Sequence, residues 1–152
     1  MRKMRRHDRA TTVEQAWEIL ENAEYMTLSM MGAEGVPYGV TLSFARVSNA
    51  LYFHCAGEGY KLDSLRLNPA VCVSAVRQQR TKAEEFTVAF ESAVAFGTAY
   101  EVTEQDEKVQ GLLAICKKYA PENTGAAAYI AQYPQVSVWR IDVTDISGKI
   151  HD

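Results

Sequence analysis

The chain has 152 residues, of which 47% are hydrophobic, 23% charged and 10% aromatic, and its formal net charge is −3. This length and composition fit one folded domain, and they exclude a disordered tail protein, a collagen-like repeat and a coiled coil. No stretch of roughly 20 predominantly apolar residues, the length that a membrane helix needs, is present. We therefore expect a single domain over residues 1–152 and no membrane association.

The charge distribution and the cysteines further limit the class of protein and its cellular setting. The first nine residues carry five basic side chains, but no apolar segment follows them, so we expect no secretory signal. The three cysteines, Cys55, Cys72 and Cys116, form no CxxC pair, which favours a reducing, cytoplasmic setting. The rest of the chain is acidic, so we interpret residues 1–11 as a short basic arm and expect no nucleic-acid binding.

The first predicted element is an amphipathic helix from about Val13 to Asn22. Thr12 and Gln15 have the spacing of a capping box, in which each side chain accepts a hydrogen bond from the backbone of the other. Apolar residues then recur at helical spacing as far as Leu20, which predicts one buried face.

Segments rich in Thr, Val, Tyr and Phe follow, and they predict β-strands. The segments are Tyr25 to Met31, Val36 to Val47, Leu51 to Cys55, Val71 to Gln78 and Phe86 to Val102. Residues 32–35 and 48–49 have the length of hairpin loops, so we expect the first three strands to form an antiparallel meander.

The remaining segments are a short helix from Lys61 to Leu67, a longer helix between Thr103 and Pro121, a loop or short helix from Gly125 to Tyr133, and a strand from Val136 to Val143. On this last strand, alternation places Trp139 and Ile141 on one face. Six strands in this order, with helices at the ends, predict a mainly β fold, a small barrel or a half-open barrel.

The common catalytic signatures HExxH, GxSxG and the Walker loop are absent. His7, His54 and His151 share no metal-ligand spacing, so we expect no metal site. Adjacent residues on a strand point to opposite faces, so His54 is poorly placed to activate Cys55. We therefore interpret Cys55 as a small buried thiol rather than a nucleophile.

The most informative segment runs from Tyr52 to Leu65, where a strand ends in small residues and a helix begins with Lys61 in its first turn. A lysine there opposes the helix dipole unless an anion is bound. Backbone N–H groups, the Ser64 hydroxyl and the Lys61 ammonium together match the acceptor oxygens of a phosphate. From this segment alone, a solvated lysine on an ordinary strand-to-helix turn is as well supported as a phosphate site.

Three other features are candidates for a binding site. Pro and Gly weaken the ladder of the strand from Pro37 to Leu42, which favours an edge strand or, as the alternative, a strand on which a planar heterocycle lies. Glu91 and Ser92 interrupt an apolar strand, so either Glu91 faces solvent and Ser92 faces inward, or both serve a polar site. Trp139 is more often a core residue than a ligand platform in this context.

The combination of these motifs resembles the pyridoxamine 5'-phosphate oxidase-like, FMN-binding split-barrel proteins, specifically their 5-nitroimidazole resistance branch. The resemblance covers nearly the whole chain and is most specific from Tyr52 to Lys61. The matching residues are Met4 to Arg6 with Asp8 and Arg9, Pro37 to Val40 with Leu42 to Phe44, Leu51 to His54 with Ala56, Gly59, Lys61 and Leu62, Asn68 with Pro69, Glu91 and Ser92 with Phe96 and Gly97, and Gly148 with Lys149.

The resemblance implies a six-stranded antiparallel split β-barrel of Greek-key type that forms a homodimer, with two FMN molecules at the subunit interface. Backbone groups of Tyr38, Val40, Thr41 and Leu42 would contact the isoalloxazine ring, and Lys61, followed by Leu62, would bind the phosphate. The other implied flavin contacts are His54, Cys55 and Ala56 along the ribityl chain and ring, Ser92 and Glu91 from a neighbouring strand, and Trp139 from the partner subunit.

Two positions depart from the family pattern. Thr41 replaces a frequent proline, which keeps the backbone route to the ring and adds a donor, and Tyr60 replaces a frequent histidine, which removes an imidazole. The resemblance implies an FMN-dependent oxidoreductase that reduces small electron acceptors such as nitroaromatics. The alternatives are a flavin-binding or storage protein without turnover, and a haem or deazaflavin binder on the same fold.

Overall fold

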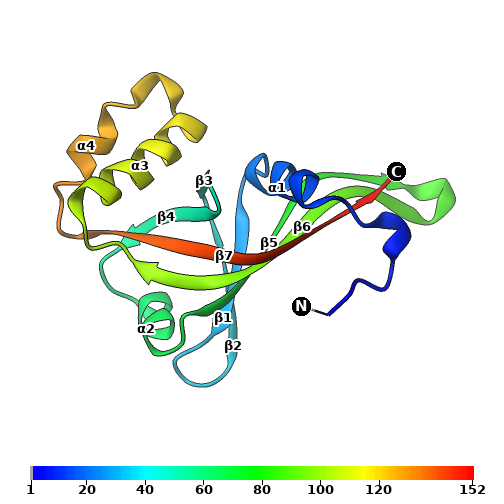
Figure 1. Cartoon of the computed structure of the whole chain (residues 1–152), viewed down its shortest axis with the longest axis horizontal. Coiled ribbons are helices and arrows are strands. Elements are labelled where there is room, and N and C mark those ends of the chain that lie inside the picture. The colour runs from blue at the N-terminus through cyan, green and yellow to red at the C-terminus, as the bar shows by residue number, and fades with distance from the viewer. Residues whose placement is uncertain (1) are drawn as a thin grey trace.

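The computed structural model describes residues 2–152, in which seven strands form one antiparallel sheet (Figure 1). Hydrogen-bonded neighbours follow the order β2-β1-β5-β6-β7-β4-β3. The strands are β1 (Met26–Met31), β2 (Pro37–Leu42), β3 (Ala45–Val47), β4 (Ala50–Ala56), β5 (Ala70–Lys82), β6 (Thr87–Glu101) and β7 (Val136–His151). The mainly β, antiparallel split barrel that the sequence predicts is confirmed, with seven strands instead of six.

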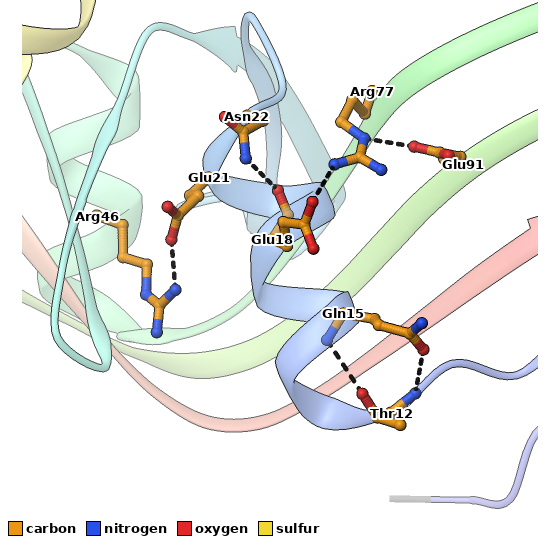
Figure 2. A network of polar contacts seen from close by, with 8 residues as sticks. All are labelled: Thr12, Gln15, Glu18, Glu21, Asn22, Arg46, Arg77 and Glu91. Carbon is orange, nitrogen blue, oxygen red and sulfur yellow. Dashed lines mark hydrogen bonds and ion pairs between the residues drawn. The ribbon is translucent and has the colours of Figure 1, made fainter.

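The helices within residues 2–152 are α1 (Val13–Glu21), α2 (Tyr60–Leu67), α3 (Gln105–Tyr119) and α4 (Ala126–Ile130), with short 3-10 turns at His7–Arg9, Ala83–Glu85 and Pro121–Asn123. The predicted capping box of α1 is present, since the Gln15 amide donates to the Thr12 hydroxyl at 3.2 Å and the Thr12 amide donates to the Gln15 side chain at 3.0 Å (Figure 2). In the described part of the chain, no helix is long and apolar enough to span a membrane.

The split in the barrel follows from a break in one predicted strand. The segment from Val36 to Val47 is expected as a single strand, but the chain turns at Ser43 and Phe44, so its two halves become β2 and β3. β2 pairs with β1 and β3 pairs with β4, which places the two halves at opposite edges of the sheet. The predicted three-stranded meander is therefore wrong, although both of its hairpins form.

The main hydrophobic core lies inside the curled sheet and beneath α1. Inward side chains of β1, β4, β5, β6 and β7 meet there, including Leu28, Phe53 and Trp139, together with Leu20 of α1. A second, smaller core joins β4 and β7 to α3 and α4 through Tyr52 and its neighbours. Because adjacent residues of β4 face opposite cores, this strand connects the barrel to the outer helices.

Two of the last three strands in the described sequence, β5 and β7, are longer than expected, while β6 lies within its predicted range. β5 and β6 continue past their neighbours as a hairpin (green, at the right in Figure 1), and β7 extends eight residues beyond the predicted end at Val143. The N-terminal segment lies along the far end of β7, where Ala10 bridges Lys149 and the Thr11 amide donates to the Gly148 carbonyl at 3.1 Å. A Cβ on Gly148 would come within 3.0 Å of Ala16, so this glycine lets α1 approach the sheet.

Candidate functional site

The junction between β4 and α2 forms as the sequence predicts. β4 ends at Ala56, and Gly59, with a φ of +136° that disfavours other residues, precedes the first residue of α2. Gly59 offers no side chain to cap the helix, and Lys61 follows in the first turn. Within residues 2–152, Lys61 forms no ion pair with a carboxylate. A half-buried cation at a helix start is a site for an anion.

The charge of Lys61 acts on both predicted contacts at the end of β4. The ammonium lies 5.7 Å from the centroid of the Phe53 ring. Partial burial lowers the pKa of His54, and the Lys61 charge lowers it further. Burial raises the pKa of the Cys55 thiol, and the Lys61 charge opposes that rise. His54 is therefore neutral near pH 7, and Cys55 is protonated, as expected for a thiol that serves no nucleophilic role.

The indole of Trp139 lies beneath this junction. It is 2% exposed and stacks on Phe53, with ring centroids 6.5 Å apart and an interplanar angle of 10°. Its N–H donates to the Ser137 hydroxyl at 3.0 Å, and that hydroxyl donates to Glu101 at 3.2 Å. Arg66, in the last turn of α2, pairs with Glu101 at 3.0 Å. In the single chain, Trp139 is thus a buried support for the site.

The inner face of β2 forms the opposite wall. Tyr38, Val40 and Leu42 are half-buried and pack against the main core, as does Cys55 from β4. The Tyr38 ring meets the edge of the Tyr60 ring, with centroids 5.0 Å apart, so β2 touches the first residue of α2. β2 is an edge strand, and half of its backbone N–H and C=O groups point away from β1.

Some predicted contacts lie outside this group. Thr41 alternates with the inward residues of β2 and is exposed on the outer face of the sheet. His54 shares its face of β4 with Tyr52, toward the second core, and Ala56 ends the strand. Leu62 is 1% exposed and belongs to the main core, so it supports the helix that carries Lys61.

Glu91 and Ser92 point in opposite directions, as the first interpretation of this pair expects, but Ser92 is the one that faces outward. Glu91 pairs with Arg77, which also binds Glu18 of α1 at 3.1 Å (Figure 2). Ser92 faces the outer surface of the sheet, beside Val76 on β5. A β-bulge between Val76 and Gln78 turns Arg77 toward α1. The Glu91 carboxylate is therefore already neutralised within the chain.

The expected phosphate contact of Ser64 is wrong. This side chain is fully buried, and its hydroxyl donates to the Tyr60 carbonyl at 2.7 Å and accepts from the Ala33 amide at 2.9 Å. Ser64 thereby attaches the β1–β2 turn to α2. Sequence reasoning also misses the series of polar contacts that joins Arg66, Glu101 and Ser137, because these residues come from three distant segments.

The assembled group offers one cation, an aromatic and aliphatic wall, and an edge strand with free backbone groups. This arrangement can bind a planar, amide-rich ring carrying an anionic tail. In the described residues, no three His, Cys, Asp or Glu side chains lie close enough to hold a metal ion.

The comparisons with known proteins agree with this geometry. The family model described as pyridoxamine 5'-phosphate oxidase matches residues 12–150. The chain belongs to this family. The expectation drawn from the sequence motifs is confirmed at the level of the family. No curated protein matches the chain.

Several solved structures share the fold of this pyridoxamine 5'-phosphate oxidase family chain. A candidate 5-nitroimidazole antibiotic resistance protein of Bacteroides thetaiotaomicron superposes with a TM-score of 0.77 at 23% identity, over 93% of this chain and 86% of its own. A flavocytochrome of Azotobacter vinelandii has a TM-score of 0.82 at 19% identity, over 99% of this chain and 72% of its own. A FAD and heme binding protein of Mycobacterium smegmatis has a TM-score of 0.78 at 20% identity, over 93% of this chain and 72% of its own. The fold is therefore one on which flavin-binding proteins are built.

Proposed function

We propose that this chain binds FMN and acts as an oxidoreductase that reduces small electron acceptors such as nitroaromatics. The observation that carries the proposal is Lys61, a half-buried cation without a carboxylate partner in residues 2–152, set between the edge strand β2 and the end of β4. An FMN phosphate would supply the missing negative charge. The flavin supplies the electron-transfer chemistry when bound.

The residues around Lys61 fit such a cofactor. By alternation from the hydrogen bond between Gly32 and Val36, the backbone groups of β2 that point away from β1 include those of Gly39 and Thr41, and they match the hydrogen-bonding edge of an isoalloxazine ring. Cys55 and the Tyr38 ring offer an apolar surface that excludes water. The chain's role is to bind and orient the flavin, while no side chain stands out as an obligatory acid or base.

We further propose that the protein acts as a homodimer with the flavin at the subunit interface, in the cytoplasm. The outer face of β1, β5 and β6, opposite the face that packs on the main core, exposes Met31, Val76 and Phe96, at 41%, 54% and 39%. Exposed apolar area of this kind is typical of a protein interface. The three cysteines are free thiols, which fits a reducing compartment.

The deciding experiment begins with the visible absorbance spectrum of the purified full chain, followed by release and mass analysis of any chromophore. We expect a flavin spectrum and released FMN. The flavin-loaded protein is then mixed with NADH or NADPH and a nitroaromatic compound, and we expect nucleotide oxidation that depends on the acceptor.

Each other outcome has a definite meaning. Bound FMN without turnover would contradict the enzyme proposal and favour a flavin-binding or storage protein. A colourless chain that ignores added FMN but titrates with haem or a deazaflavin would overturn the cofactor assignment. Haem is a specific alternative because two of the structural neighbours are described as a flavocytochrome and a FAD and heme binding protein.

A further inference from the structure

A hollow of about 700 Å³ lies between the end of α1, strand β3 and α3. None of its lining residues belongs to the candidate flavin site. Its floor is apolar and includes Leu113 and Ala114 of α3. Its rim carries three cationic side chains, Arg46, Lys117 and Lys118, and one carboxylate, Glu21.

Two of these cations are held in place by aromatic rings. The Arg46 guanidinium lies 4.3 Å from the centroid of the Trp17 ring, pairs with Glu21 (Figure 2) and donates to the Ser48 carbonyl at 2.7 Å. The Lys118 ammonium lies 3.8 Å from the centroid of the Phe44 ring and donates to the Ala23 carbonyl at 2.7 Å. Cations fixed in this way need little further ordering to bind a ligand.

The charges around the hollow are unbalanced. Glu21 neutralises Arg46, which leaves Lys117 and Lys118 in the last turn of α3. Burial lowers the pKa of Lys118 to about 8, and the Glu21 charge opposes this only in part. A negative charge placed in the hollow would therefore strengthen the protonated form of Lys118.

We propose that this hollow is a second ligand site, which binds a small organic anion with an apolar body, such as an aromatic carboxylate. The carboxylate interacts with Lys118 and Lys117, and the ring lies on Leu113 and Ala114. The apolar floor favours such a ligand over inorganic phosphate, whose oxygens would lose water without finding enough donors. The site is separate from the flavin site and does not depend on flavin binding.

The test uses 1-naphthoate as the probe and the purified full chain, with the backbone amide shifts of Leu113 and Ala114 followed by NMR. We expect saturable shifts at these amides. The neutral analogue 1-naphthalenemethanol has the same rings without the charge, and we expect it to bind about tenfold more weakly, because it makes no charge-assisted hydrogen bond.

Variants separate this site from general binding to a basic surface. Lys118→Met keeps the aliphatic stem, and Lys117→Gln changes an exposed side chain, so at least the second leaves the fold intact. We expect each to weaken naphthoate binding severalfold. Lys108→Gln on the same helix lies outside the hollow and serves as the matched control, with unchanged affinity.

Results of three kinds would overturn the proposal. The first is the absence of shifts at Leu113 and Ala114 up to the solubility limit of naphthoate. The second is equal binding of naphthoate and its neutral analogue, or equal affinities of the Lys117→Gln and Lys108→Gln variants. The third is release of bound flavin by naphthoate, which would assign the anion to the flavin site.

Discussion

At the scale of single residues, Lys61 decides the flavin proposal. Its ammonium has no carboxylate partner in residues 2–152 and faces the end of β4. We predict that Lys61→Gln weakens FMN binding by about 1.5 to 3 kcal/mol, the usual contribution of a hydrogen bond to a charged group. Quenching of flavin fluorescence in a titration measures this change.

The matched control for Lys61 is Lys108→Gln, which removes a lysine from α3, where its ammonium donates to the Tyr133 carbonyl. We expect the control to bind FMN as the unaltered chain does. Equal affinities of the two variants would mean that the phosphate binds elsewhere.

The pH dependence of stability tests the environment of Lys118. The pKa of Lys118 is lowered in the folded chain to about 8 from an ordinary value of 10.5, so between these values the unfolded chain binds a proton that the folded chain does not. Stability therefore rises with pH across this window. We predict that the free energy of unfolding of the unaltered chain rises relative to that of Lys118→Met between pH 8 and pH 10.

Urea denaturation of both proteins across this range measures the difference. Comparing the two proteins removes the opposing contribution of Cys55 and Cys72, whose raised pKa values lower stability as the pH rises. A difference that falls with pH would show that Lys118 is stabilised, not destabilised, in its charged form.

The sequence predicts the role of a residue well where neighbours in sequence determine it. It fails where a partner distant in sequence determines that role. The position of Lys61 follows from the strand ending and helix start around it. The direction of Glu91 depends on Arg77 and on a bulge in the neighbouring strand, and the role of Ser64 depends on the Ala33 amide. Neither partner is visible in the local sequence.

At the scale of elements, Gly97 shows how tightly β6 and β7 pair. A Cβ on this residue would lie 2.3 Å from the Asp142 carbonyl oxygen, which belongs to the backbone and cannot move aside. We predict that Gly97→Ala destabilises the chain by about 1 to 3 kcal/mol, as overpacking does. Thermal unfolding followed by circular dichroism measures the loss.

Gly125→Ala is the control for this substitution. Gly125 has a helical φ of −62° and open space around its Cβ position, so alanine fits there without strain. We expect its melting temperature to stay the same or rise slightly. Equal destabilisation by both substitutions would contradict the packing argument.

The element boundaries show what local sequence determines. The capping box fixes the start of α1, and Pro69 fixes the end of α2, so both are predicted closely. The turn at Ser43 and Phe44 carries no glycine or proline, so the sequence does not mark it. Phe44 is fully buried, and its amide donates to the Tyr119 hydroxyl at 3.1 Å, so the break depends on α3.

At the scale of the whole molecule, the proposed dimer makes a prediction about the outer sheet face. Val76 lies on that face and is 54% exposed. We predict that Val76→Arg places a charge in the dimer interface, converts the protein to a monomer and reduces flavin binding, because the flavin would lie between subunits. Light scattering coupled to size-exclusion chromatography measures the mass.

Val13→Arg is the matched control, because Val13 on α1 is also 54% exposed and lies away from this face. We expect it to leave the mass unchanged. A monomeric unaltered chain, or a dimer that persists in Val76→Arg, would contradict the proposed interface.

The position of β7 has a consequence for synthesis on the ribosome. Within residues 2–152, β7 follows the other strands in sequence, yet it lies between β6 and β4 and joins the β3–β4 hairpin to the rest of the sheet. During translation, β4 therefore lacks this second partner until β7 emerges from the ribosome. The barrel can close only after β7 has left the ribosome, so until then the nascent protein exposes the edges of β4 and β6, which are prone to aggregation.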